Sequence, residues 1–404
     1  MSQFNVVRNA VTADQIYFDV TVTNFQSTTT VPPIFYYNDG RTMPFIDNPE
    51  DYYLSIQRFT LETGTIPVFV PSIQPGPSQT NPNLTIYSIT LEYTDAVLGT
   101  ATSGQVFLQW IPQDKSAQVP PAPSQTATKT QVNDTGYYNC YSLGYLTTFI
   151  SGYFGGAMNL LKADALAKGI TLPSQFAPQM IWDTTGNVAT IYADVLGYDQ
   201  NPSNPAEQIK IYWNAPLFEL FNTFPAFYLG YTGVTLGKNY QILPYFTSAN
   251  GLLPILTPTI PSTEIWQGIP VYQEVSTIAN ITPVSAIVFT SNTLPIEPSQ
   301  VSTPLVYNNA SILALGGNNA DIANIVTDLV TDSGIYRPNV VYTPTAEYRL
   351  ITLYGNRPLY NLDLQIFYRI KTGQLIPIRI ASGQGITIKL AFLKKSSRMK
   401  HNGA

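Results

Sequence analysis

The chain has 404 residues, of which 44% are hydrophobic and only 11% are charged, and its formal net charge is −5. This length fits two ordinary domains or one large β domain, and the apolar content excludes disorder as the main state. The acidic balance argues against wholesale nucleic-acid binding, which requires a basic footprint.

The missing charge is replaced by small polar residues, 27 Tyr and 32 Pro. Because the centres of interfaces lose charge and gain aromatic residues, this composition favours a surface largely covered by other chains. A secreted β protein with a Thr/Ser-rich exterior is the alternative. The single Cys140 excludes an internal disulfide, and the sequence shows neither a signal peptide nor a run long enough to span a bilayer. We therefore expect synthesis in the cytoplasm.

Alternation of apolar and polar residues, which is typical of half-buried β-strands, dominates the chain. In chain order, it predicts strands at 15–25, 84–93, 104–111, 188–196, 208–213, 269–275, 285–290, 346–353, 361–370, 375–380 and 385–393. Pro- and Gly-rich loops are expected at 70–83, 111–130 and 252–262. Many short strands divided by such loops predict an all-β sandwich or barrel.

Two longer segments have helical spacing instead. The first, 142–168, starts at the capping residue Ser142 and ends before Gly169, although Gly155 and Gly156 weaken its middle. Its apolar stripe comprises Leu143, Leu146, Ile150, Tyr153, Ala157, Leu160 and Leu161. The second helix is predicted near 318–330, with Ile322, Ile325, Val326 and Leu329 inward, and a short helical turn at 215–221.

The strand at 361–370 has the clearest pattern. It predicts Leu362, Leu364, Ile366, Tyr368 and Ile370 inward, with Asp363, Gln365 and Arg369 outward. Because each long helical segment precedes several strands, we expect two β-rich lobes. The first would cover 1–215 and the second 216–404, the latter ending in the C-terminal strand trio and a basic tail at 394–404.

The residues offer little catalytic chemistry. The only histidine, His401, lies in the tail, and one Cys with one His cannot make a zinc site. The tripeptides at Asp134 and Asp332 resemble those of aspartic proteases, but they follow a polar loop and a predicted helix rather than apolar strands. A β-sandwich adhesin or carbohydrate-binding module is a further alternative, with a sugar platform built from Trp110, Trp182, Trp213 or Trp266. These residues mostly lie within strand patterns, which favour a core position for them.

The C-terminal third, "YRPNVVYTPTAEYRLITLYGNRPLYNLDLQIFYRI" and the strands after it, resembles the end of capsid proteins from virophages and polinton-like viruses. The segments "FYYNDGRTMPFIDNPEDYYLSIQRFTLETGTIPVFVP", "YSITLEY" and "IVFTSNTLPI" add to this resemblance. It implies a jelly-roll barrel with an additional β-rich domain or a second jelly roll, and no catalytic residues, metal or cofactor.

The length most resembles that of the penton, or minor capsid, protein of these viruses. The resemblance implies a structural component of an icosahedral double-stranded DNA virus capsid, a pentamer at the vertices beside the major capsid protein. A trimeric double jelly-roll major capsid protein remains the alternative within the family, and an aspartic-protease-like hydrolase the alternative outside it.

The chain ends in a basic tail that contains Lys394, Lys395, Arg398 and Lys400. If the last strand faces the interior of the particle, this tail would neutralise phosphates of packaged DNA or contact an acidic patch of a neighbouring capsid protein. A solvated terminus without a partner is the alternative.

Overall fold

The computed structural model describes residues 13–25, 32–75, 80–123, 131–133, 135–202, 206–230, 237–246, 255–256, 265–296, 325–330, 339–342, 349–371, 373 and 375–395. The chain divides into two compact units. Unit 1 consists of Met1–Ile66 and Val284–Ala404, and unit 2 of Pro67–Pro283. The boundary predicted near residue 215 was wrong, because it falls inside unit 2, within the helix Ala215–Leu220.

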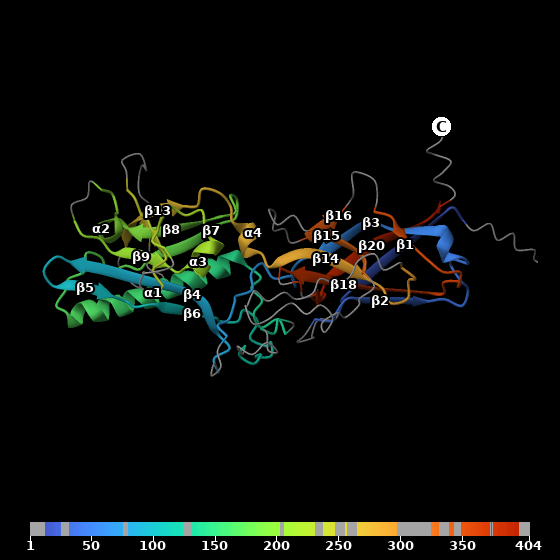
Figure 1. Cartoon of the computed structure of the whole chain (residues 1–404), viewed down its shortest axis with the longest axis horizontal. Helices are drawn as coiled ribbons and strands as arrows, with labels where there is room; N and C mark the ends of the chain where they lie inside the picture. The colour runs from blue at the N-terminus through green and yellow to red at the C-terminus, as the bar shows by residue number, and fades with distance from the viewer. Residues whose placement is uncertain are drawn as a thin grey trace, which may run out of the picture. The chain divides into compact units, whose positions relative to one another are not determined.

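Unit 1 is built from two five-stranded antiparallel sheets (Figure 1). The first sheet has the order β1-β20-β3-β16, with β17 also paired to β3, and the second has the order β15-β14-β18-β19, with β2 also paired to β18. Their bounds are β1 Gln15–Thr23, β2 Tyr36–Gly40, β3 Tyr52–Glu62, β14 Val284–Thr290, β15 Ile325–Val330, β16 Asn339–Tyr342, β17 Ile351–Thr352, β18 Asn361–Ile370, β19 Leu375–Pro377 and β20 Gly385–Lys394. A 3₁₀ helix, η1, covers Pro49–Asp51.

The strand order of unit 1 identifies its fold. When β1, β2, β3, β14, β15, β16, β18 and β20 are counted from one to eight, the sheets read 1-8-3-6 and 2-7-4-5. This is the order of a jelly roll, in which two Greek keys form two facing sheets. Unit 2 is inserted between the third and fourth strands of the roll.

The core of unit 1 lies between the two sheets. Alternate residues of β18, including Leu362, Leu364 and Ile366, belong to one buried cluster with Leu390 and Phe392 of β20. The inward positions predicted for 361–370 are therefore confirmed, since all five are at most 4% exposed. Period-two alternation produces this arrangement because successive side chains of a strand point to opposite faces.

The second predicted helix, near 318–330, was wrong. Ile325–Val330 forms strand β15, which pairs with β14, and 318–324 lie outside the described residues. Ile, Val and Thr favour β-strands. The short apolar pattern fits either a helix or a strand, and pairing with β14 stabilises the strand.

Unit 2 contains a six-stranded and a four-stranded antiparallel sheet. The first has the order β10-β11-β9-β4-β5, with β6 also on β4, and the second has the order β12-β13-β8-β7. The bounds are β4 Leu84–Asp95, β5 Gly99–Thr102, β6 Val106–Gln109, β7 Gln179–Asp183, β8 Val188–Asp194, β9 Lys210–Trp213, β10 Ala226–Tyr228, β11 Tyr240–Ile242, β12 Ile255–Leu256 and β13 Trp266–Tyr272. The helices are α1 Leu143–Ala167, α2 Val195–Tyr198, α3 Ala215–Leu220 and α4 Ile278–Ile281.

Helix α1 confirms the helix predicted at 142–168. The Ser142 side chain accepts a hydrogen bond from the Tyr145 amide, and Gly169 ends the helix with a φ of +70°. The helix runs without interruption through Gly155 and Gly156 because its buried side packs on both sheets of unit 2. Leu160 departs from the predicted stripe, since it is 50% exposed.

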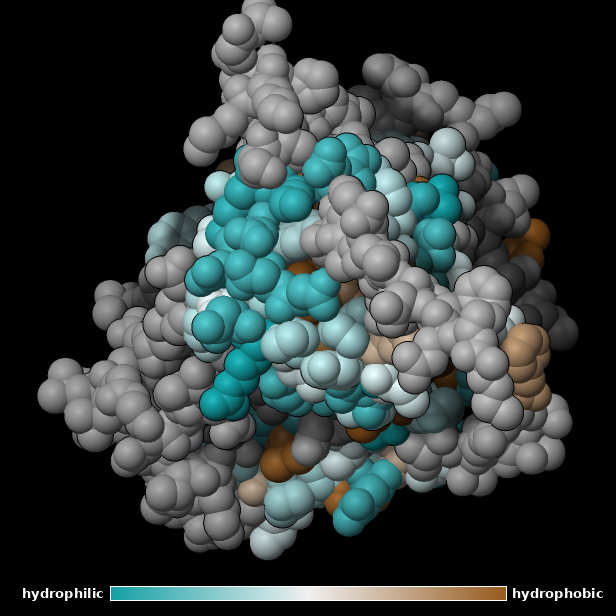
Figure 2. Space-filling view, turned by 90° about the vertical axis from the view of Figure 1, so that its right-hand side faces the viewer, coloured by the Kyte–Doolittle hydropathy of each residue, from teal (hydrophilic) through white to brown (hydrophobic). Residues whose placement is uncertain are grey.

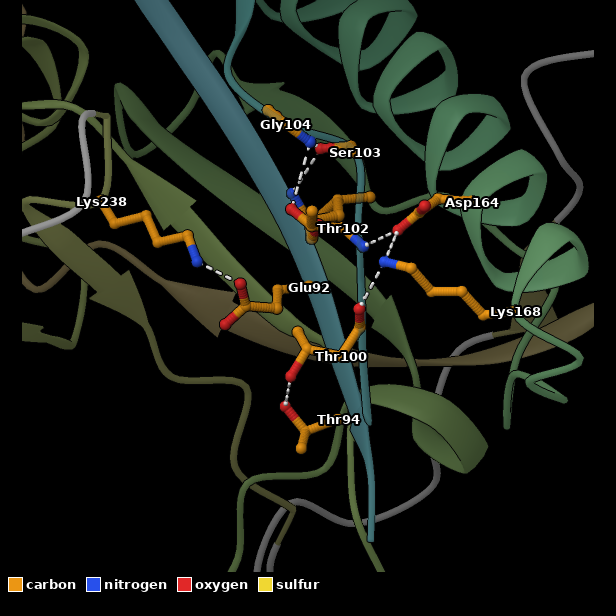
Figure 3. Close-up of polar contacts among 10 residues, drawn as sticks. Glu92, Thr94, Thr100, Thr102, Ser103, Gly104, Asp164, Lys168 and Lys238 are labelled. Carbon is orange, nitrogen blue, oxygen red and sulfur yellow. Dashed lines mark hydrogen bonds and ion pairs between the residues drawn. The ribbon is translucent and has the colours of Figure 1, made fainter. Parts of the chain in front are cut away.

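Polar contacts attach strand β5 to the last turns of α1 (Figure 3). The Asp164 carboxylate accepts hydrogen bonds from the Thr102 amide and from Lys168, each at 2.8 Å, while Lys168 Nζ also donates to the Thr100 carbonyl at 2.7 Å. These bonds occupy the Thr102 amide and the Thr100 carbonyl on the outer edge of β5. Without them, both groups would be open to pairing with a strand of another chain.

The two sheets and α1 give unit 2 a core of its own. Its strand order differs from that of a jelly roll among the described residues, so it is the additional β-rich domain rather than a second roll. None of the described helices is both long and apolar enough to cross a membrane.

Candidate interaction surface

The final strand, β20, lies between β1 and β3, and the first two cations of the predicted basic tail, Lys394 and Lys395, lie at its C-terminal end. The Lys394 amide donates to the Asp14 carbonyl at 2.9 Å, next to β1. Lys395 follows directly and holds its Nζ 5.1 Å from the centre of the Tyr53 ring on β3. Arg398 and Lys400 lie outside the described residues. The structure therefore describes two of the four predicted tail cations.

The tail continues from a sheet surface that carries further cations. Phe18, Ile388 and Phe59 point into the core, so their neighbours on β1, β20 and β3 point outward. These outward residues include Tyr17, Tyr53, Arg58, Lys389 and, beyond the strand end, Lys395. We call this set the basic sheet face.

A row of charges crosses the basic sheet face at Lys389. In the register of the sheet, Lys389 lies opposite Asp19 of β1 on one side and opposite Arg58 of β3 on the other. Arg58 approaches Asp19 at 4.0 Å, and both side chains are about two-thirds exposed. Such an exposed pair contributes little stability, about 0–1 kcal/mol, because water screens it.

Charge is distributed unequally between the two units. Unit 1 contains 14 Lys and Arg residues and 13 Asp and Glu residues, whereas unit 2 contains 6 Lys, no Arg and 12 Asp and Glu residues. The acidic balance of the chain therefore belongs to unit 2.

Figure 2 shows one side of unit 1, where hydrophilic residues dominate and hydrophobic ones form only small separate spots.

Sequence reasoning misplaced one charged residue, Asp363. It was predicted outward, but it is only 2% exposed. Its Oδ1 accepts hydrogen bonds from Ser291 Oγ and Thr293 Oγ1 at 2.7 Å and from the Thr293 amide at 2.9 Å. The Asn292 amide also donates to this carboxylate, at 2.9 Å.

These contacts determine the ionisation of Asp363. Burial alone would raise the pKa of its carboxyl, but the hydrogen bonds from Ser291, Thr293 and Asn292 outweigh burial and hold the pKa below its ordinary value. The position of Asp363 between two core leucines was the only signal in the sequence for this role. The groups that donate to its carboxylate lie in a turn far away along the chain, so the sequence did not predict them. Asp363 therefore anchors the turn that follows β14, and it is a structural residue.

The other candidate residues do not form a reactive site. Cys140 is fully buried, donates to the Ser142 carbonyl at 3.2 Å, and has its pKa raised by burial to about 11, so its thiol stays protonated at neutral pH. Asp134 and Asp332 lie outside the described residues. Among the residues that the structure describes, no group of three His, Cys, Asp or Glu side chains is placed to hold a metal ion.

The core position that the strand patterns favour is confirmed for three of the four Trp residues, and the alternative sugar platform is not supported. Trp110, Trp213 and Trp266 are at most 4% exposed, and Trp182 is half-buried. Trp110 and Trp213 lie in the core of unit 2, where they make ring contacts with Phe149 and Phe154. Buried indoles cannot stack on a sugar, so the Trp residues stabilise the core.

A protein-family model described as Sputnik minor capsid protein V18/19 matches residues 16–394. The chain is 31% identical over 216 residues to "Structural protein V19" of Sputnik virophage, covering 53% of this chain and 93% of that protein. It is also 31% identical over 163 residues to "Uncharacterized protein V18" of the same virophage, covering 40% of this chain and 93% of that protein.

Two solved structures resemble the whole chain. A chain in the 3.5 Å cryo-EM structure of the Sputnik virophage has a TM-score of 0.73 and 29% identity, covering 96% of this chain and 99% of that one. The crystal structure of the mavirus penton protein has a TM-score of 0.55 and 13% identity, covering 94% and 99%, and shares the fold. The chain therefore belongs to the Sputnik minor capsid protein V18/19 family, and it is a structural protein of a virus capsid.

Proposed function

We propose that the chain forms a closed ring of five copies at the vertices of an icosahedral capsid that encloses double-stranded DNA. The observation that carries this proposal is the jelly roll of unit 1 with unit 2 inserted between its third and fourth strands. A protein named as a penton, that of mavirus, has a similar fold over its whole length.

Surface composition supports the assembly. Only 11% of the residues are charged, so identical copies meet at lateral surfaces without a large electrostatic mismatch. Heterologous contacts between identical copies close into a ring when the rotation between neighbours divides the circle evenly. The ring would be bordered by copies of the major capsid protein.

A trimeric, hexon-type capsomer is the competing assembly. It was expected for a chain with two jelly rolls, and the strand orders of unit 2 do not support that arrangement. We therefore favour the pentamer over the trimer. We also propose that the chain is made in the host cytoplasm, where a single thiol such as Cys140 stays reduced.

The mass of the purified full-length chain in solution tests this proposal. Light scattering should give about 222 kDa, five times the 44.5 kDa of one chain, and electron microscopy should show rings with fivefold symmetry. A mass of about 134 kDa, three times that of one chain, would indicate the trimer. A monomer that persists at high concentration would contradict the proposal.

We propose, as part of the same function, that the tail with Lys394, Lys395, Arg398 and Lys400 extends into the shell and contacts packaged DNA. Lysine and arginine side chains that neutralise phosphates release the counterions condensed on the nucleic acid, which favours binding.

A further inference from the structure

Two cations lie directly opposite each other on neighbouring strands of the basic sheet face. Lys389 on β20 and Arg58 on β3 are register partners. Asp19, the register partner of Lys389 on β1, lies 4.0 Å from Arg58 and offsets part of the repulsion between the two cations. With Lys395, the basic sheet face carries three cations beside this one carboxylate.

A β-bulge brings Arg58 to this position. The register shifts between Lys389, which faces Arg58, and Leu390, which faces Ile56. Gln57 is therefore the extra residue, and it allows both Ile56 and Phe59 to point into the core while Arg58 points outward. Bulges of this kind re-aim side chains and are common beside functional sites.

Tyrosine rings hold two of the cations over the surface. Lys389 Nζ lies 4.9 Å from the centre of the Tyr17 ring, and Lys395 Nζ lies 5.1 Å from that of Tyr53. Each cation–π contact orders a flexible lysine side chain. Breaking the contact so that the ammonium group can bind a ligand would cost only about 0.5–1 kcal/mol. The ammonium groups are thus partly ordered while Tyr17 remains 51% exposed.

We propose that the basic sheet face binds the phosphate backbone of nucleic acid, next to the DNA contacts proposed for the tail. This inference rests on the proposed placement of the tail inside the shell. Arg58 supplies a planar donor for phosphate oxygens, and Lys389 and Lys395 supply point charges.

The spacing of the cations fits a regular polyanion. Lys389 and Lys395 are six residues apart along β20 and its continuation, about 20 Å at the rise of a strand. A nucleic-acid strand carries a charge every 3.4 Å or so of axial rise, so it presents phosphates along this whole distance. An acidic protein surface, such as unit 2 of a neighbouring copy with its 12 Asp and Glu residues, is the competing partner.

The test compares full-length variants in binding to a fluorescently labelled DNA duplex across about 50–200 mM salt. The double variant Arg58→Gln/Lys389→Gln should bind more weakly. Its slope of log affinity against log salt should fall by about 2 for each copy that touches the duplex, since each released counterion contributes about 0.9. The matched control Lys115→Gln/Arg357→Gln removes the same charges from exposed positions elsewhere and should keep the wild-type slope.

Further arms separate the sources of binding. A chain that stops after Lys395 should retain part of the salt-dependent affinity, and its salt slope should fall by about 2 more when Arg58→Gln and Lys389→Gln are added, since each lost phosphate contact contributes about 0.9. An unchanged slope in the full-length double variant would overturn the inference. If the double variant lost binding to labelled polyglutamate but bound the duplex as the wild type does, the inference would be overturned in favour of an acidic protein partner.

Light scattering on the same samples distinguishes this result from the pentamer proposal. If the double variant has an unchanged slope and a pentameric mass, the nucleic-acid site is refuted and the pentamer proposal stands. If it has a reduced slope and the wild-type chain has a monomeric mass, the nucleic-acid site stands and the pentamer proposal is refuted.

Discussion

Replacement of Asp363 tests whether a single buried carboxylate anchors the turn after β14. In the variant Asp363→Ala, the amides of Asn292 and Thr293 and the hydroxyls of Ser291 and Thr293 lose their acceptor. The backbone amide of residue 363 donates to Thr293 Oγ1 at 3.0 Å, and this bond remains in the variant, so the substitution tests the carboxylate alone.

The expected cost follows from the groups left without partners. Each buried donor that loses its acceptor costs about 1–3 kcal/mol, but among these residues only Ser291 is buried, and the exposed Asn292 and half-buried Thr293 regain hydrogen bonds from water. We therefore expect about 2–3 kcal/mol for Asp363→Ala, or a fall in the melting temperature of unit 1 of about 5–10 °C. Asp363→Asn keeps one acceptor oxygen and should cost about 1 kcal/mol.

Hydrogen exchange measured by mass spectrometry, combined with calorimetry, is the appropriate assay because the two units need not unfold together. Peptides that cover 290–294 and β18 should lose protection in both variants, while peptides from unit 2 should not change. Asp19→Asn is the control, since this carboxylate is 64% exposed and should alter stability by less than about 0.5 kcal/mol.

The pH dependence gives the reasoning a second check. Because the pKa of Asp363 is held below 3.8, its contribution to stability is complete above that pH and is lost as the pH falls through the lower pKa of the folded chain. The difference between wild type and Asp363→Asn should therefore shrink below pH 3.8. An unchanged melting temperature at neutral pH, or a difference that persists in acid, would refute the anchoring role.

Two further outcomes are expected in unit 2. Gly152→Ala should stabilise α1 by about 0.5–1 kcal/mol, because the position is helical with no atom near the added Cβ. Gly169→Ala should destabilise it by about 1–2 kcal/mol, because φ is +70°; equal melting temperatures would contradict both. Cys140, buried and with its pKa raised to about 11, should resist a thiol reagent at pH 8 or so until the chain is unfolded, and fast labelling of the native protein would contradict this.

The sequence predicted local structure better than long-range organisation. The strand at 361–370 and the helix at 142–168 were found because their apolar periods are long and regular. The segment 325–330 was assigned wrongly because six residues are too few to separate a helical from an extended period. Asp363 was misplaced because a turn from a distant segment covers the outer side of its strand, and no local pattern announces that turn.

The division into units was also beyond local reasoning. Two consecutive lobes were expected, yet β1 and β20 pair along their whole length, from Gln15 with Leu393 to Thr23 with Gly385. A pairing across that separation leaves no period in the sequence. For the candidate surface, the sequence identified the tail cations, but the proximity of Arg58 to Lys389 depends on a bulge and a register.

The pairing of β1 with β20 has a consequence for synthesis on the ribosome. The jelly roll needs strands from both sides of the inserted unit 2. Its first sheet lacks β20, the strand between β1 and β3, until residue 394 has been made. Unit 2 is contiguous and has its own core, so it can fold while unit 1 still waits for its last strand. A prematurely terminated chain would thus carry a folded insert on an open sandwich, and only finished polypeptides would supply building blocks for the shell.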